Sequence, residues 1–92
     1  MKKQVVYFAQ VGGSTGLIII ARSDDPNERL KSLRGNRSEP VELLGVCDGD
    51  LAPVYRILQP YRVEGKPKWF HPHARLLAWI GKYCRLSDRT ER

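Results

Sequence analysis

The side chains best able to do chemistry in this chain are basic, and aromatic residues lie among them. Lys and Arg that neutralise phosphate groups gain affinity by releasing counterions, and aromatic rings add stacking that RNA and single-stranded nucleic acid favour. The alternative is a solvated basic face whose rings lie in the core. The predicted binding surface consists of Arg22, Arg29, Lys31, Arg34, Arg37, Arg62, Lys66, Lys68, Arg75 and Lys82, with Tyr55, Tyr61 and Trp79 beside them.

The distribution of charge indicates the same class of partner. The 92 residues carry a net charge of +6. Residues 1–51 hold seven basic and seven acidic side chains, whereas residues 52–92 hold nine basic and three acidic. All of the excess therefore lies in the C-terminal part, and we expect a polyanionic partner, nucleic acid first. A soluble surface that is merely basic is the alternative.

Other reactive residue types lack the spacing that a cofactor or metal site needs. His71 and His73 have no third ligand at a suitable spacing, so we expect them to cap backbone groups or to contact phosphate. The glycine-rich run 12–16 lacks the following Lys of a phosphate-binding loop and is predicted to be a turn. Cys47 and Cys84 form no CxxC pair and are expected to be reduced, packed thiols. We predict no cofactor and no bound metal.

The elements that position these side chains begin with a β-hairpin. Residues 4–10 alternate and residues 17–21 are apolar at consecutive positions, which is typical of a central strand covered on both faces. A helix is predicted to begin at Pro26, capped by Asp25 with Glu28 completing a capping box, and to stop at Gly35-Asn36.

The second half of the chain predicts a strand over 41–47 and two more helices. The first of these runs over 51–59 with Asp50 as its cap. The second follows Pro72 and ends near Tyr83, with Leu76, Leu77 and Ile80 on its apolar stripe. Between them, the pair Trp69-Phe70 is expected to anchor the core.

Together these elements predict one small α+β domain over residues 1–84. It has a three-stranded antiparallel sheet flanked by three helices, and residues 85–92 form a charged flexible tail. Neither a signal peptide nor a membrane span is visible, so we expect an intracellular, cytoplasmic protein with no membrane partner.

Several short motifs follow one another along the chain: Val6-Tyr7-Phe8, Ile19-Ile20-Ala21-Arg22-Ser23, Pro26-Asn27-Glu28-Arg29-Leu30-Lys31-Ser32-Leu33, Pro40-Val41-Glu42-Leu43-Leu44-Gly45 and Gly65-Lys66-Pro67-Lys68-Trp69-Phe70. Their order resembles the GIY-YIG endonuclease fold, in particular its subgroup of phage-encoded and meiotically up-regulated domains. No single motif is decisive, but together and in this order the motifs cover most of the chain. The resemblance implies that Tyr7 and Arg29 are remnants of a phosphate-facing pocket.

The resemblance also shows where the family's catalytic set is missing. The family mechanism needs a carboxylate to hold a divalent metal against the scissile phosphate. In the register that the resemblance implies, Leu51 takes the place of the family's Glu and Tyr55 that of its His. Lys68 replaces a second Glu, and a lysine repels Mg²⁺ and attracts phosphate. Ala21 replaces the family's glycine.

Three functions are compatible with these residues. The first is a catalytically inactive GIY-YIG-like domain that binds nucleic acid or a nucleoprotein complex through its basic surface. The second is a phage-encoded inhibitor of a host defence complex, similar to anti-CRISPR proteins, acting by protein and guide-RNA contacts. The third is a divergent metal-dependent nuclease in which Asp48, Asp50 or Glu42 has taken over metal binding.

Overall fold

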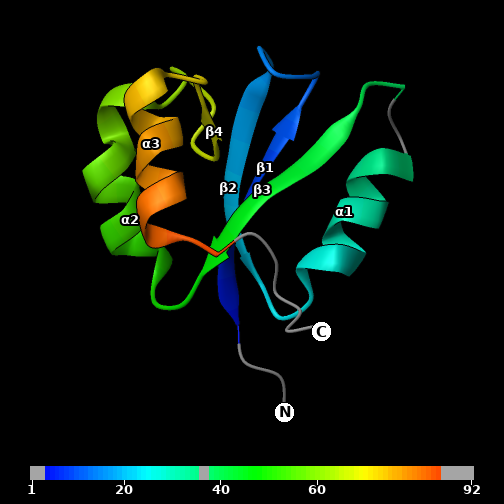
Figure 1. The fold of residues 1–92 in the computed structure, drawn as a ribbon, viewed down its shortest axis with the longest axis horizontal. Helices are drawn as coiled ribbons and strands as arrows, with labels where there is room; N and C mark the ends of the chain where they lie inside the picture. The colour runs from blue at the N-terminus through cyan, green and yellow to red at the C-terminus, as the bar shows by residue number, and fades with distance from the viewer. Residues whose placement is uncertain (1–3, 36–37, 86–92) are drawn as a thin grey trace.

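Helices cover both faces of a four-stranded antiparallel sheet in a computed structural model that describes residues 4–35 and 38–85 (Figure 1). In this described part, the strands are β1 (Val5–Val11), β2 (Leu17–Ser23), β3 (Val41–Cys47) and β4 (Trp69–Phe70), in the order β3-β1-β2-β4. The helices are α1 (Pro26–Gly35), α2 (Leu51–Leu58) and α3 (Ala74–Tyr83), and a single 3₁₀ turn, η1 (Gln59–Tyr61), follows α2. The predicted α+β class is confirmed.

The sheet has one strand more than the sequence predicted. Phe70 pairs with Ile18 and Trp69 with Ile19, so the expected core anchor is also a short strand, β4. Two residues are too few to show the alternation that marks a strand in a sequence, and here the pairing with β2 defines the strand. Strand β2 lies between β1 and β4, which confirms its predicted central position.

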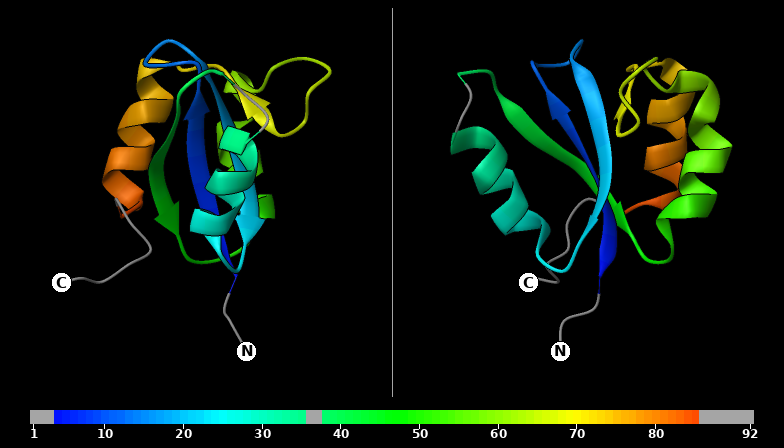
Figure 2. Two further views of the ribbon diagram at one scale, coloured as in Figure 1. Left: turned by 90° about the vertical axis from the view of Figure 1, so that its right-hand side faces the viewer. Right: turned by 180° about the vertical axis from the view of Figure 1, so that it is seen from behind.

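The central strands supply two cores, one on each face of the sheet. All seven residues of β1 are buried, because alternate side chains of a strand point to opposite faces and both faces are covered. Tyr7 and Ile19 pack in the core beneath α1, whereas Phe8 and Ile20 pack in the core beneath α2 and α3. Figure 2 shows α1 on one side of the sheet and the α2–α3 pair on the other.

Polar side chains fix the beginnings of two helices. The Asp25 carboxylate accepts a hydrogen bond of 3.2 Å from the backbone N–H of Glu28, which confirms the predicted cap of α1. His73 Nδ1 accepts one of 3.0 Å from the backbone N–H of Arg75, which confirms the predicted capping by a histidine. Asp50 lies at the N-cap of α2, as predicted, but within the described residues its side chain makes no capping hydrogen bond.

Helix α3 presents a different side to the sheet than the sequence predicted. Leu77 is 39% exposed, whereas Trp79, expected on an outward basic face, is half-buried with its ring centroid 5.9 Å from that of Phe8. Helical spacing places these two residues on opposite flanks of the Leu76–Ile80 stripe. The sheet lies toward the Trp79 flank, which helical periodicity alone does not reveal.

The chain beyond α3 pairs with β3 at one point. Val46 and Arg85 exchange two backbone hydrogen bonds of 2.9 Å each, and the Arg85 guanidinium lies 3.3 Å from the Asp48 carboxylate. The predicted flexible tail therefore does not include Arg85; residues 86–92 and the predicted Asn36 stop lie outside the described residues. None of the described helices has the length and apolar character needed to cross a membrane.

Candidate nucleic-acid interface

A pocket of about 530 Å³ opens on the α1 face of the sheet. Tyr7 of β1 contributes to it and is only 3% exposed, so its ring belongs to the wall rather than the surface. Residues from the segment before β1, from β2, from α1, from the start of α2 and from the segment before β4 complete the lining. They are Gln4, Ile19, Ala21, Arg22, Arg29, Ser32, Leu33, Leu51 and Lys68.

The charge of this pocket is positive. Three of its lining side chains are the cations Arg22, Arg29 and Lys68, all exposed, and the described lining contains no Asp or Glu. The Lys68 backbone carbonyl accepts a hydrogen bond of 3.0 Å from the N–H of Ile20, which holds the base of this side chain beside β2. Cations gathered around one hollow attract an anion more strongly than the same cations dispersed over a surface.

Tyr7 and Arg29 interact within this pocket. Burial raises the pKa of the Tyr7 hydroxyl above its usual 10.0, and the charge and hydrogen bonding of the Arg29 guanidinium lower it in part. The net direction is upward, so the hydroxyl stays protonated at neutral pH. The pocket therefore offers a neutral phenol, able to donate a hydrogen bond, beside a permanently charged guanidinium.

Leu51 and Tyr55, which take the places of the family's Glu and His in the resemblance, have different surroundings. Leu51, at the start of α2, lines the pocket. Tyr55, one helical turn later, donates a hydrogen bond of 2.6 Å to the Ile20 carbonyl. Burial raises the pKa of Tyr55, the charge of Arg62 lowers it, and Tyr7 raises it further. Tyr55 thus fastens α2 to β2 rather than presenting its ring for stacking.

Arg62 is half-buried against aromatic rings. Its guanidinium carbon lies 4.9 Å from the Tyr55 ring centroid and 5.6 Å from that of Phe70, and its buried Nε has no hydrogen-bond partner among the described residues. A second hollow of about 420 Å³ lies along the loop after it, lined in part by Glu64 and Lys66. Lys66 lies in this loop and not on α2.

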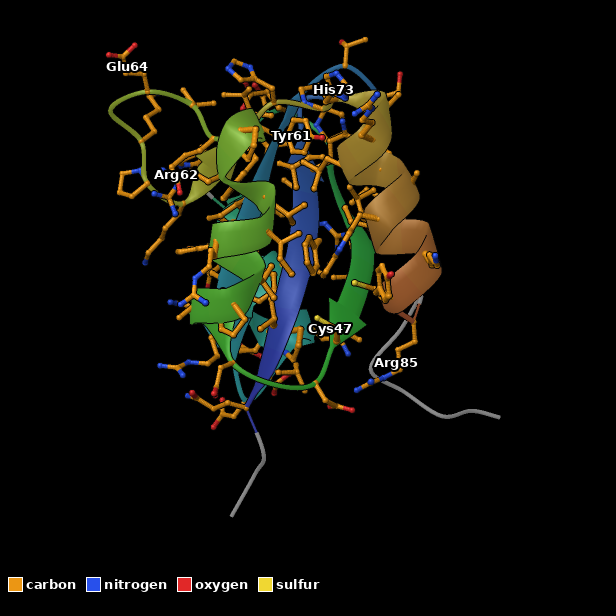
Figure 3. The ribbon with its side chains drawn as sticks, turned by 90° about the vertical axis from the view of Figure 1, so that its left-hand side faces the viewer. Cys47, Tyr61, Arg62, Glu64, His73 and Arg85 are labelled. Atoms are coloured by element: carbon orange, nitrogen blue, oxygen red, sulfur yellow. The ribbon has the colours of Figure 1, made fainter. Side chains whose placement is uncertain are left out.

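Tyr61 was also predicted to be available for stacking with a partner, and its ring is already stacked. The ring centroids of Tyr61 and His73 lie 4.9 Å apart with an interplanar angle of 29° (Figure 3). This contact joins η1 to the beginning of α3. His73 uses Nδ1 to cap α3, so the same side chain serves the helix end and the ring contact.

The remaining predicted basic residues do not form one surface. The Arg34 guanidinium donates two hydrogen bonds, of 3.1 and 2.8 Å, to the Val41 carbonyl and so ties α1 to β3. Lys31 is exposed on α1. Arg75 and Lys82 are exposed on α3, across the sheet from the pocket. Arg37 lies outside the described residues.

Of the carboxylates suggested for a divergent nuclease, Glu42 lies in β3, whereas Asp48 and Asp50 follow that strand. Glu42 is next to the strand's first residue and Asp48 follows its last, a separation of about 20 Å at the usual rise of a strand. Asp48 is paired with Arg85, and Asp50 begins α2. Within the described ranges, no group of three or more His, Cys, Asp or Glu side chains could hold a metal ion.

Two polar lining residues, Ser32 and Gln4, were not predicted from the sequence. Ser32 lies one helical turn after Arg29 on α1, so the helical spacing of the two residues could have indicated it. Gln4 precedes β1, and no feature of the sequence marks it. A comparison of the chain with protein-family models, with curated proteins and with solved structures finds no match.

Proposed function

We propose that this chain binds nucleic acid, alone or within a nucleoprotein complex, through the pocket of Tyr7, Arg22, Arg29 and Lys68. The observation that carries the proposal is the gathering of three cations and a protonated phenol around one hollow whose described lining has no carboxylate. Phosphate groups of a nucleic-acid backbone match this arrangement in charge and in hydrogen-bond acceptors.

The spatial grouping also supports a relation to the GIY-YIG fold. Tyr7, Arg29, Leu51 and Lys68 come from four separate segments that the resemblance aligned with the family's pocket, and all four line one hollow. With Leu51 and Lys68 at the places of two family carboxylates, the pocket would hold a phosphate by direct contact with cations and not through a metal. We therefore propose a binding domain that does not cleave.

A binding and cleavage assay tests this proposal. Labelled single- and double-stranded DNA and RNA are incubated with the protein at low salt, with and without Mg²⁺, and read by fluorescence anisotropy and by gel. We expect salt-sensitive binding without cleavage, weakened strongly by Lys68→Glu and little by Lys82→Glu on the opposite side of the sheet. No binding at low salt would refute the proposal, and Mg²⁺-dependent cleavage would favour the divergent nuclease.

A specific observation also supports the second function, an inhibitor of a host defence complex. Ile57 on α2 is 55% exposed, and on α3 Leu77 is 39% and Tyr83 is 56% exposed. Exposed apolar side chains of this size are suited to a protein partner. If this function holds, Ile57→Asp would weaken a complex with the defence effector, whereas Ile57→Leu would not.

A further inference from the structure

The described part of the chain brings Cys47 and Cys84 to facing positions. Val46 and Arg85 exchange both backbone hydrogen bonds, as a hydrogen-bonded antiparallel pair does. Cys47 follows Val46 in β3, and Cys84 precedes Arg85 in the opposite segment. The antiparallel register therefore makes the two cysteines a non-hydrogen-bonded pair, in which Cα atoms are about 4.5 Å apart.

Two further observations support this juxtaposition. The two thiols are close enough for each to shift the pKa of the other. Gly45 makes room for the approach, because a Cβ atom at this position would lie 2.9 Å from the Cβ of Cys84 and 3.1 Å from the Cγ2 of Ile80. Figure 3 shows Cys47 at the end of β3, on the same side of the molecule as Arg85.

We propose that Cys47 and Cys84 form a reversible disulfide that fastens the end of α3 to the edge strand β3. A disulfide requires Cα atoms about 4.4–6.8 Å apart, and the non-hydrogen-bonded pair meets this condition without moving the backbone. Both side chains are half-buried, so a small oxidant can reach them. The bond would close a ring of roughly 40 residues, 47–84, that contains α2, β4 and α3.

The oxidant is a low-molecular-weight disulfide such as oxidised glutathione. The Cys47 thiolate attacks one of its sulfurs, and the first glutathione thiolate leaves and takes up a proton. Cys84 then gives up its proton to water, its sulfur attacks the Cys47 sulfur of the mixed disulfide, and the second glutathione thiolate leaves. The protein loses two electrons and two protons, and the disulfide reagent gains them as two thiols.

The neighbours of the two thiols set the pH at which this exchange is fast. Burial raises the pKa of both, that of Cys84 to about 12; Asp48 raises and Arg85 lowers the pKa of Cys47. Contact with Cys84 also lowers the pKa of Cys47, so Cys47 is the first nucleophile. Because only thiolates react, oxidation is expected to be slow at neutral pH and to accelerate toward pH 9.

The test compares the chain treated with oxidised glutathione near pH 9 with the chain kept in dithiothreitol. We expect a monomer lighter by two hydrogen atoms, a peptide joining Cys47 to Cys84, and a midpoint of thermal unfolding raised by about 10–20 °C. Dithiothreitol should reverse all three changes. Cys84→Ser and Cys47→Ser should show neither the mass loss nor the rise.

Results of three kinds would overturn the proposal: two free thiols after prolonged oxidation, a mixed disulfide with glutathione that does not close, or disulfide-linked dimers in place of the monomeric ring. The cysteines pack in the core beneath α2 and α3, whereas the proposed phosphate pocket lies beneath α1. A failure of the disulfide therefore leaves the proposed nucleic-acid interface untouched, and the reverse also holds.

Discussion

Neutralising Lys68 changes one charge of the proposed interface, and the effect can be calculated. If Arg22, Arg29 and Lys68 each neutralise one phosphate, the slope of log affinity against log salt is about −2.7 for duplex DNA and about −2.1 for single strands. Duplex affinity then falls about 40-fold between 50 and 200 mM salt, and Lys68→Gln reduces this loss to about 12-fold.

Fluorescence anisotropy over a salt series measures these slopes directly. Lys82→Gln is the matched control, because Lys82 is also exposed and lies on α3, across the sheet from the pocket. We expect its slope to equal that of the unmodified chain. A slope lowered by Lys82→Gln but unchanged by Lys68→Gln would refute the assignment of the interface to the pocket, even if the protein binds nucleic acid.

Three further predictions concern stability. Gly45→Ala should destabilise the fold by about 1–3 kcal/mol, because the new methyl group would meet the end of α3. Gly81→Ala, a helix position with open space around it, should be neutral or stabilising. Urea unfolding of the two variants compares these effects. Asp25→Ala should cost about 1 kcal/mol by removing the cap on the Glu28 N–H, and an unchanged urea midpoint would contradict this. The free energy of unfolding should fall as the pH rises from 9.0 toward about 12. Folding raises the pKa of the Cys84 thiol, so over this range the folded state retains a proton that the unfolded state releases. Urea titrations at fixed pH should show a smaller decline for Cys84→Ala.

Local patterns in the sequence were sufficient for most elements of the fold. The capping signal at Asp25 correctly placed the start of α1, and the continuous apolar run of β2 correctly indicated a strand covered on both faces. Both depend on residues adjacent in the chain. The sequence also correctly indicated that a histidine near the start of α3 caps that helix.

The candidate site was only partly accessible from the sequence. Tyr7, Arg29 and Lys68 were named as candidate residues, but their placement around one hollow depends on strand order and helix packing. The same packing separates them from Arg75 and Lys82, which lie on α3 across the sheet (Figure 2) although they were predicted to belong to the same binding surface. Charge is a property of composition, whereas a surface is a property of the folded chain.

The sequence by itself determined the features that depend on residues near one another in the chain. These are the helix caps, the hairpin, the basic excess and the identity of the apolar positions. Only the tertiary structure decided that Trp69-Phe70 is a strand, that α3 buries its Trp79 flank, and that Cys47 faces Cys84. The physical reason is that each of these depends on a partner distant in the chain. Backbone hydrogen bonds and core packing join such partners only after folding, and no local periodicity records them.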